Sequence, residues 1–212
     1  MTVVSRSEAA EVGKITGLIL AGGRGARMGL RNKAMLPLGG EILLARVRRR
    51  LASQVSGIMV AVHGDVSDWA PLCAGCSVVV DERQPRQGPL AGLETALRHV
   101  PNDWLLSVPV DVPFFPLDLA WRLGGECRDG RQPIVAMSRG RMHPTVALWP
   151  GGMLGAVTAA LDRNQRGLND FLRQIPHVRV EFPDEYGGFD PFFNINTLQD
   201  LEEAACWLEF LP

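Results

Sequence analysis

The residues best suited to chemistry near the start of the chain are basic side chains within a glycine-rich stretch. An apolar run over residues 17–21 leads into it. Its glycines are Gly22, Gly23, Gly25 and Gly29, and its basic residues include Arg24, Arg27 and Lys33. Because glycine has no Cβ, backbone N–H groups can approach an anion closely, and the arginine and lysine side chains supply full positive charges. The stretch therefore predicts a loop that cradles a polyphosphate.

Two common phosphate-binding loops do not fit this spacing. The dinucleotide fingerprint G-x-G-x-x-G fails because Met28 occupies the place of its third glycine. The Walker loop requires glycine directly before its lysine, whereas Asn32 precedes Lys33. A glycine-rich hairpin or strand-to-helix turn with solvated arginines is the alternative that involves no function.

Carboxylates follow two further apolar runs. Asp81 comes directly after residues 77–80, and Asp111 comes after residues 104–110. Ligands of parallel sheets collect beyond the carboxyl ends of the strands, where both aspartates are expected. A carboxylate beside a triphosphate is suited to hold Mg²⁺, so Asp111 is the predicted metal ligand. The structural alternatives are a turn before Pro113 for Asp111 and a strand-end cap for Asp81.

Apolar runs alternate with helical patterns along most of the chain. Strands are expected at 17–21, 57–62, 77–80, 104–110, 134–137, 145–149 and 178–182, and helices at 41–54, 89–100, 116–127, 151–161 and 168–174. Such alternation is typical of βαβ units with a largely parallel sheet covered on both faces. The predicted fold class is α/β, with a single three-layer, Rossmann-like domain.

Composition sets the outer limits. With 212 residues, 46% of them hydrophobic, the chain can bury one full core, and we expect a domain over 15–212 after a flexible polar leader at 1–14. The net charge of −1 argues against a nucleic-acid binder. No apolar run is long enough to span a bilayer and no signal peptide is evident, which predicts a cytoplasmic protein without a membrane partner.

Five separated blocks resemble the molybdenum cofactor guanylyltransferase family, a group of nucleotidyltransferases. They are L-A-G-G-x-x-x-R-M-G-x-x-x-K from Leu20 to Lys33, D-x-x-x-x-x-x-G-P-L-A-G from Asp81 to Gly92, P-x-D-x-P around Asp111, H-P-T from His143, and N-x-N-T from Asn194. The resemblance covers about residues 15–205. It implies that the nucleotide contacts Leu20, Ala21, Gly22, Gly23, Lys33, Asp81, Gly88 and Asp111, with Asp81 at the nucleoside and Asp111 on the metal.

The resemblance also implies the reaction. The phosphate of molybdopterin attacks the α-phosphorus of GTP, pyrophosphate leaves, and the dinucleotide cofactor forms. Arg27, Lys33 and Asp111 with Mg²⁺ are the expected catalytic groups, which neutralise charge on the transferring and leaving phosphates. GTP and molybdopterin are then the substrates, and molybdoenzymes or their cofactor chaperones are candidate partners.

Three polar residues are candidates for contact with the second substrate. His143 lies beside a proline and could instead cap a turn. Asn194 and Asn196 alternate with apolar residues and are expected on one face of a strand. Thr197, with Asp200 three residues on, predicts the cap of a final helix.

The family pattern is broken at three positions, which keeps alternatives open. Asn32 replaces the usual aspartate before the lysine, and Ala61 and His63 stand where asparagines are common. The L-A-G-G form goes with GTP and L-A-A-G with CTP, so Gly22 alone carries the preference over a cytidylyltransferase. Another small-molecule nucleotidyltransferase, or a non-catalytic nucleotide-binding or cofactor-handover protein, would share parts of the same pattern.

Overall fold

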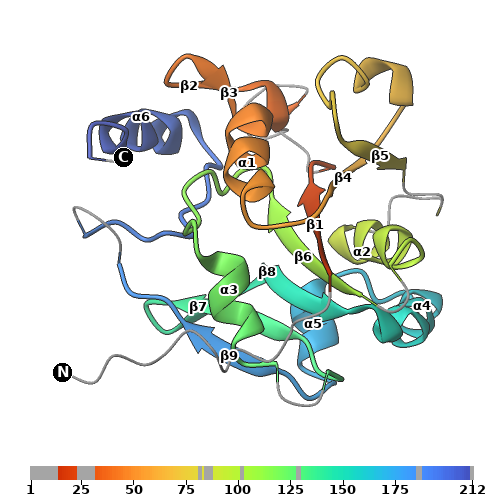
Figure 1. Cartoon of the computed structure of the whole chain (residues 1–212). Coiled ribbons are helices and arrows are strands. Elements are labelled where there is room, and N and C mark those ends of the chain that lie inside the picture. Colours follow the sequence, from red (N-terminus) through yellow and green to blue (C-terminus); the bar gives the residue numbers. More distant parts are fainter. Residues whose placement is uncertain are drawn as a thin grey trace.

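A seven-stranded sheet runs through the computed structural model of the chain (Figure 1). The structure describes residues 14–22, 32–80, 83, 88–100, 103–127, 130–184 and 188–210. In spatial order the strands are β5 (Ser77–Val80), β4 (Ile58–Val62), β1 (Ile15–Leu20), β6 (Trp104–Pro109), β8 (Arg141–Pro150), β7 (Ile134–Ser138) and β9 (Val178–Glu181). A separate hairpin is made by β2 (Pro37–Leu38) and β3 (Glu41–Ile42).

The first half of the sheet is parallel and determines where a ligand can bind. Ile19 of β1 lies beside Val60 of β4 on one side and Val108 of β6 on the other. Strand β8 is antiparallel to both β6 and β7, and β9 is parallel to β7. The chain goes outward from β1 to β4 and β5, then returns to the other side of β1 with β6. Crevices at such a reversal of strand order are the usual ligand sites of open α/β sheets.

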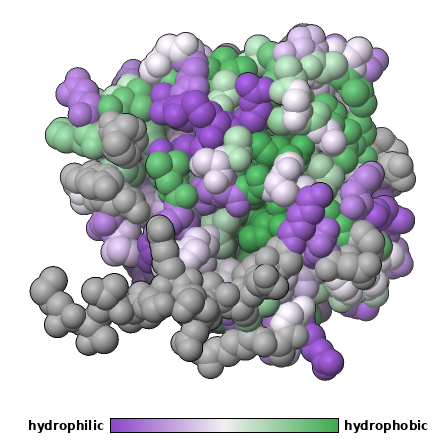
Figure 2. Space-filling view, viewed as in Figure 1, coloured by the Kyte–Doolittle hydropathy of each residue, from purple (hydrophilic) through white to green (hydrophobic). Residues whose placement is uncertain are grey.

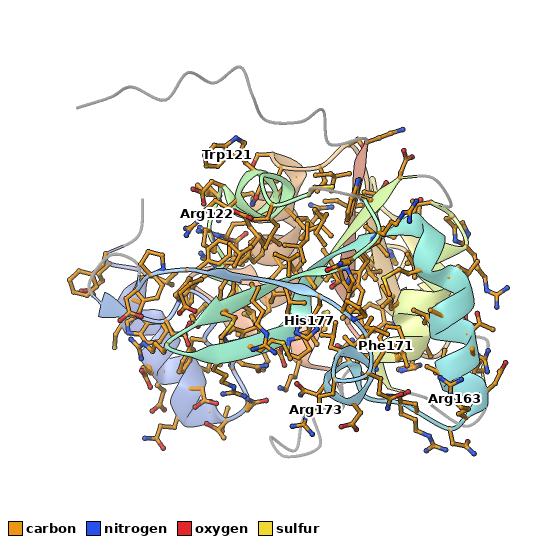
Figure 3. The ribbon with its side chains drawn as sticks, turned by 90° about the horizontal axis from the view of Figure 1, so that it is seen from below. Trp121, Arg122, Arg163, Phe171, Arg173 and His177 are labelled. Atoms are coloured by element: carbon orange, nitrogen blue, oxygen red, sulfur yellow. The ribbon has the colours of Figure 1, made fainter. Side chains whose placement is uncertain are left out.

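Helices cover both faces of the sheet. On one face lie α1 (Leu43–Ala52) and α3 (Leu119–Gly124), with α6 (Leu198–Trp207) in the same hydrophobic cluster. On the other lie α2 (Pro89–Leu97), α4 (Leu154–Asp162) and α5 (Leu168–Leu172). Viewed from below, Trp121 and Arg122 of α3 lie above the sheet, and Phe171 of α5 lies below it (Figure 3).

The strands are apolar on both sides because each side has its own core. Ile19 packs into the cluster that contains α1 and α3, whereas its neighbour Leu18 packs into the cluster that contains α2, α4 and α5. This two-sided burial is what continuous apolar strands require. The predicted α/β class and three layers are confirmed.

Several element boundaries differ from those predicted. The helix expected from residue 41 begins at Leu43, because Glu41 and Ile42 pair with β2. The helix expected from residue 151 starts as the 3-10 turn η4 (Gly151–Met153), since its two glycines favour a helix poorly. The helix expected at 116–127 is shorter, ending at Gly124.

The strand predicted to carry Asn194 and Asn196 is wrong. Residues 193–196 belong to neither a helix nor a strand. The backbone N–H groups of Ile195 and Asn196 donate to the Asp111 carbonyl and the Asp200 carboxylate, respectively, instead of to a strand neighbour. The alternation of polar and apolar residues there reflects local packing.

The predicted leader at 1–14 stays untested, since residues 1–13 lie outside the described ranges. None of the helices within those ranges combines the length and the apolar character that crossing a bilayer demands. On the face of Figure 1, hydrophilic side chains are spread among hydrophobic ones and do not gather at one place (Figure 2).

Candidate active site

A cavity of about 430 Å³ opens beyond the carboxyl ends of β1, β4 and β6. It is lined by Leu20, Gly22, Lys33, Ala61, Val62, His63, Gly88, Pro89, Gly92, Pro109, Val110, Asp111, Thr145 and Asn194. Five residues predicted to contact a nucleotide therefore share one cavity: Leu20, Gly22, Lys33, Gly88 and Asp111. The side chain of Ala21 instead packs in the core.

Lys33 is held in this cavity by a short helical turn. The turn η2 (Lys33–Met35) begins after Asn32, whose side-chain oxygen accepts a hydrogen bond of 3.0 Å from the Ala34 N–H. Capping of this kind needs only a short side chain with an oxygen, and aspartate would serve equally. The departure from the family pattern at Asn32 thus preserves the local structure that positions Lys33.

The Lys33 ammonium joins two segments of the site. Its Nζ atom donates to Asp111 Oδ2 and to Asn196 Oδ1, each at 2.8 Å. The lysine is only 8% exposed, so the pair is well shielded from solvent. Asp111 also accepts at its backbone carbonyl from the Ile195 N–H at 2.9 Å. Residues 33, 111 and 196 consequently form one unit, which we call the Lys33 triad.

The start of α6 fixes the position of Asn196. Asp200 Oδ2 accepts from the N–H groups of Asn196 and Thr197 at 2.7 and 2.8 Å, and Thr197 Oγ1 accepts from the Asp200 N–H at 3.1 Å. The predicted cap by Thr197 and Asp200 is confirmed as a full capping box. The same carboxylate therefore caps a helix and orients a side chain of the Lys33 triad.

Gly22 and His63 lie in contact at the ends of β1 and β4. A Cβ atom at Gly22 would lie 2.6 Å from Cδ2 and 2.8 Å from Nε2 of His63, closer than atoms normally approach. The His63 carbonyl accepts a hydrogen bond from Trp69 Nε1 at 3.2 Å, which ties this strand end to the segment that follows. The imidazole therefore occupies the space that any side chain at position 22 would need.

Gly88 is required at the entrance to α2. Its φ of 75° favours glycine, and a Cβ there would lie 2.9 Å from the Arg166 carbonyl oxygen. The guanidinium of Arg83 donates twice to the buried Glu94 of α2 and once to Asp162 of α4, all at 2.8 Å. These hydrogen bonds from Arg83 lower the pKa of Glu94. Arg83 thus links α2 to α4 through Glu94 and Asp162.

A second, wider space of about 1000 Å³ adjoins the first, and we call it the outer cleft. Pro89, Thr145 and Asn194 line both spaces, so they are continuous. The polar and charged residues on the wall of the outer cleft include Arg141, His143, Asn169, Asp170, Arg173, Asp190, Asn194, Asn196 and Asp200. All three predicted second-substrate residues, His143, Asn194 and Asn196, are among them.

His143 is part of a hydrogen-bonded group rather than a simple turn cap. Its Nε2 lies 2.7 Å from Ser138 Oγ, which donates to Asp190 Oδ1 at 2.7 Å. The imidazole packs against the Phe192 ring, with 4.9 Å between centroids. Burial lowers the pKa of His143, although the negative charge of Asp190 opposes the shift. Neither Ser138 nor Asp190 was predicted as a site residue, because they lie 52 positions apart in the chain.

Three predicted site residues, Gly23, Arg27 and Asp81, lie outside the described residues. The structure does not test their roles. Thr145, the threonine of the H-P-T block, and His63, which stands where asparagine is common in the family, also line the first cavity.

The oxygen atoms near Asp111 suit a Mg²⁺ ion that is shared with a substrate. Within the described residues, no group of three or more His, Cys, Asp or Glu side chains could hold a metal alone. Magnesium commonly uses one or two carboxylates, and phosphate and water oxygens fill its other positions. Asp111, on the cavity wall, offers one such carboxylate. The donor set therefore fits a metal that arrives with a polyphosphate.

Nearly the whole chain is similar to known nucleotidyltransferases. Residues 17–180 match the family model described as a MobA-like NTP transferase domain. The chain is 40% identical to the molybdenum cofactor guanylyltransferase of Rhizobium meliloti, over 92% of each chain. It is 41% identical to the protein of that name from Rhizobium rhizogenes, over 95% of this chain and 96% of the relative.

Solved structures share the fold. Molybdopterin-guanine dinucleotide biosynthesis protein A from Archaeoglobus fulgidus superposes with a TM-score of 0.75 at 22% identity, over 92% of this chain and all of that one. A nucleotidyl transferase from a Methanothermobacter species gives a TM-score of 0.70 at 20% identity, over 92% of this chain and 98% of its own. From the matched family model and the curated relatives, the chain belongs to the molybdenum cofactor guanylyltransferase family.

Proposed function

We propose that the protein transfers GMP from GTP to the phosphate of molybdopterin and releases pyrophosphate. The observation that carries this proposal is the Lys33 triad, which places a cation and a carboxylate at the meeting point of two adjoining cavities. A nucleotidyl transfer needs such a point, because two phosphate groups must meet there. The names of the curated relatives support guanylyl transfer over cytidylyl transfer.

The two cavities fit two substrates. The 430 Å³ cavity at the ends of β1, β4 and β6 would receive the nucleotide, and the outer cleft would receive the pterin. Thr145 and Asn194 line both and lie between the two sites. This arrangement brings the acceptor phosphate to the α-phosphate on the side of Asp111.

The chemical step needs no protein nucleophile. A phosphate monoester is mostly dianionic near pH 7, since its second pKa is about 6. One of its oxygens attacks the α-phosphorus in line, a P–O bond forms, and the bond from the α-phosphorus to the bridging oxygen breaks. Pyrophosphate leaves with that electron pair. Catalysis is then a matter of positioning and of charge neutralisation.

Each residue of the site has a role in this proposal. Lys33 donates to the phosphate oxygens, and Arg27, outside the described residues, keeps the role expected from the sequence. Asp111 would hold Mg²⁺, which when bound withdraws charge from the phosphate oxygens it contacts. Asn196 holds the Lys33 ammonium in place from the side of the outer cleft.

The test is a transfer assay with purified protein, molybdopterin and each of GTP, CTP, ATP and UTP. We expect equimolar pyrophosphate and guanine dinucleotide from GTP, at a rate at least tenfold above the other nucleotides. EDTA should stop the reaction and Mg²⁺ should restore it. Pyrophosphate release without a dinucleotide product, or equal rates with CTP, would contradict the proposal.

The variant Asp111→Asn tests whether Asp111 is a metal ligand or only stabilises a turn. The amide keeps the shape of the side chain but loses the charge that holds a hard cation. We expect turnover to collapse and the remaining activity to need more Mg²⁺, while the melting temperature stays within a few degrees. A lowered melting temperature with unaltered Mg²⁺ dependence would show that Asp111 stabilises the fold and does not bind the metal.

Two further expectations stay predictions. They are the binding of molybdoenzymes or their cofactor chaperones as partners, and the cytoplasmic location of the protein.

A further inference from the structure

Two side chains at the wall of the outer cleft, His143 and Asp190, form a hydrogen-bonded relay with the buried Ser138, and the proposed reaction does not yet use it. Asp190 accepts at Oδ1 from Ser138 Oγ, and Ser138 Oγ lies 2.7 Å from His143 Nε2. Ser138, at the end of β7, is fully buried. Asp190 is itself fixed, because the same Oδ1 atom accepts from the Phe192 N–H at 2.9 Å.

The direction of each hydrogen bond follows from counting protons. An ionised carboxylate only accepts, so the single hydroxyl proton of Ser138 goes to Asp190. The serine oxygen can then take part in the bond to His143 only as an acceptor. Nε2 of His143 must therefore carry a proton, and in a neutral imidazole the other nitrogen, Nδ1, is left with a lone pair.

The environment favours the neutral imidazole and leaves its second nitrogen accessible. Burial lowers the pKa of His143, and the nearby Arg141 acts in the same direction, against Asp190 and Glu181. Within the described residues, only Arg46 Nε and Gln165 Nε2 are enclosed side-chain atoms without a hydrogen-bond partner. Nδ1 of His143, which has no bond in that part of the chain, is thus open to the outer cleft that the residue lines.

We propose that Ser138 and Asp190 hold His143 as a neutral hydrogen-bond acceptor for an N–H group on the ring system of the second substrate. This inference rests on the proposed function and deepens it. A pterin ring is rich in amino and ring N–H donors, whereas its phosphate, near pH 7, offers acceptors that a lone pair repels. His143 therefore selects the ring end, and the phosphate is left to face Lys33. Ser138 and Asp190 are positioning residues in this scheme.

The first test observes the tautomer directly and needs no substrate. Histidine ¹⁵N NMR of the full-length protein at pH 7.5, with His143 assigned from the spectrum of His143→Gln, should show a neutral ring protonated at Nε2. Ser138→Ala should lose this preference, and so should Asp190→Asn. A charged ring, or a proton on Nδ1, in the unaltered protein would overturn the proposal.

The second test measures binding. Equilibrium dialysis of molybdopterin should give a dissociation constant about tenfold higher for His143→Ala and for Ser138→Ala, with that of GTP changed less than twofold. The double variant should be no worse than His143→Ala alone, since the serine acts through the histidine. His143→Asn, which retains a short acceptor, should recover part of the loss.

Two matched control variants distinguish a role in binding the second substrate from an effect on the stability of the protein. Ser56→Ala removes another hydrogen-bonded serine hydroxyl, beside the start of β1, and His99→Ala removes an exposed histidine just beyond the end of α2. Both should bind molybdopterin as the unaltered protein does. Additive effects in the double variant, or equal losses for GTP, would show a merely structural role. A correct tautomer and tight pterin binding without any transfer would instead fault the proposed function.

Discussion

At the scale of single residues, the charges of Lys33 and Asp111 neutralise each other before any nucleotide binds. The Lys33 ammonium already has a carboxylate and an amide oxygen as partners, both at 2.8 Å. In the proposed mechanism, a triphosphate would therefore compete with Asp111 for the lysine. The Asp111 carboxylate would then become free to accept a metal. Nucleotide and metal should for this reason strengthen each other's binding.

The first prediction concerns this lysine. Lys33→Met keeps the apolar stem and removes the charge, so transition-state stabilisation should fall by about 2–4 kcal/mol, or roughly 30- to 1000-fold in kcat/KM. Steady-state kinetics measure this. The melting temperature should also fall by a few degrees, because Asp111 is left without its partner in a shielded site. Arg49→Met, at an exposed position of α1, is the control. Turnover near that of the unaltered protein would remove Lys33 from the mechanism.

The second prediction concerns the contact between Gly22 and His63. Gly22→Ala must displace the imidazole from the cavity wall, since the new methyl group would overlap it. We expect the KM for GTP to rise about tenfold and the preference over CTP to narrow. Adding His63→Ala removes the overlap, so the double variant should fold as stably as His63→Ala alone. If Gly22→Ala keeps both KM and selectivity, position 22 does not set the choice of base in this protein.

Residues that end a strand could be predicted from the sequence, and residues that meet by folding could not. Asp111 follows an apolar run, and the rule for parallel sheets places it at the ligand edge. The Lys33 triad, by contrast, joins positions up to 163 apart. The relay of Ser138, His143 and Asp190 shows no spacing that a local pattern could reveal. Such partners are selected by the packing of distant segments.

At the scale of elements, the beginning of α6 links helix formation to the active site. The Asp200 carboxylate accepts from two N–H groups, one of which belongs to Asn196. Asn196 in turn accepts from Lys33. Any loosening of the first turn of α6 is thus transmitted to a group that contacts the nucleotide in the proposed mechanism.

The third prediction distinguishes the two roles of Asp200, which are to cap α6 and to hold Asn196 in place. Asp200→Ala should lower the free energy of unfolding by about 1–2 kcal/mol, as the loss of a cap usually does. It should also raise the KM for GTP several-fold, because Asn196 loses its anchor. Thr197→Ala removes only the other half of the capping box, so it should cost stability without the change in KM. Equal KM values for the two variants would limit Asp200 to helix capping. Denaturant unfolding and initial rates supply both measurements.

The elements themselves were predictable where burial alone decides their type. The central strands are apolar on both faces and short, which separates them from helices. The errors occurred where local competition decides. Glu41 and Ile42 pair with β2 in a short hairpin, and the N–H groups of Ile195 and Asn196 donate to Asp111 and Asp200, respectively. These outcomes depend on partners that the local sequence does not contain.

At the scale of the whole molecule, the half-buried imidazole of His143 links stability to pH. Burial lowers its pKa in the folded state below the ordinary value of 6.5. Below that pH the unfolded chain takes up a proton that the folded protein resists, so stability is fully present above about pH 6.5 and is lost as the pH falls. The carboxylates with lowered pKa values, such as Glu94, act in the same direction at lower pH.

The fourth prediction follows from this loss of stability as the pH falls. Between pH 7.5 and 5.5, the free energy of unfolding should fall more steeply for the unaltered protein than for His143→Asn, which cannot take up a proton. Urea unfolding at several pH values measures the difference. His99→Asn, at an exposed position, should keep the slope of the unaltered protein. Parallel curves for His143→Asn and the unaltered protein would contradict this origin of the pH dependence.

The bond between Lys33 and Asn196 also has a consequence for protein synthesis. The ribosome makes the chain from its N-terminus, so Lys33 and Asp111 emerge well before Asn196 and the Asp200 that orients it. A chain that ends before residue 196 contains β1, β4 and β6, yet it lacks the side-chain oxygen of Asn196 that accepts from the lysine. The lysine of an unfinished chain should therefore reach its final position only after the segment around α6 has left the ribosome.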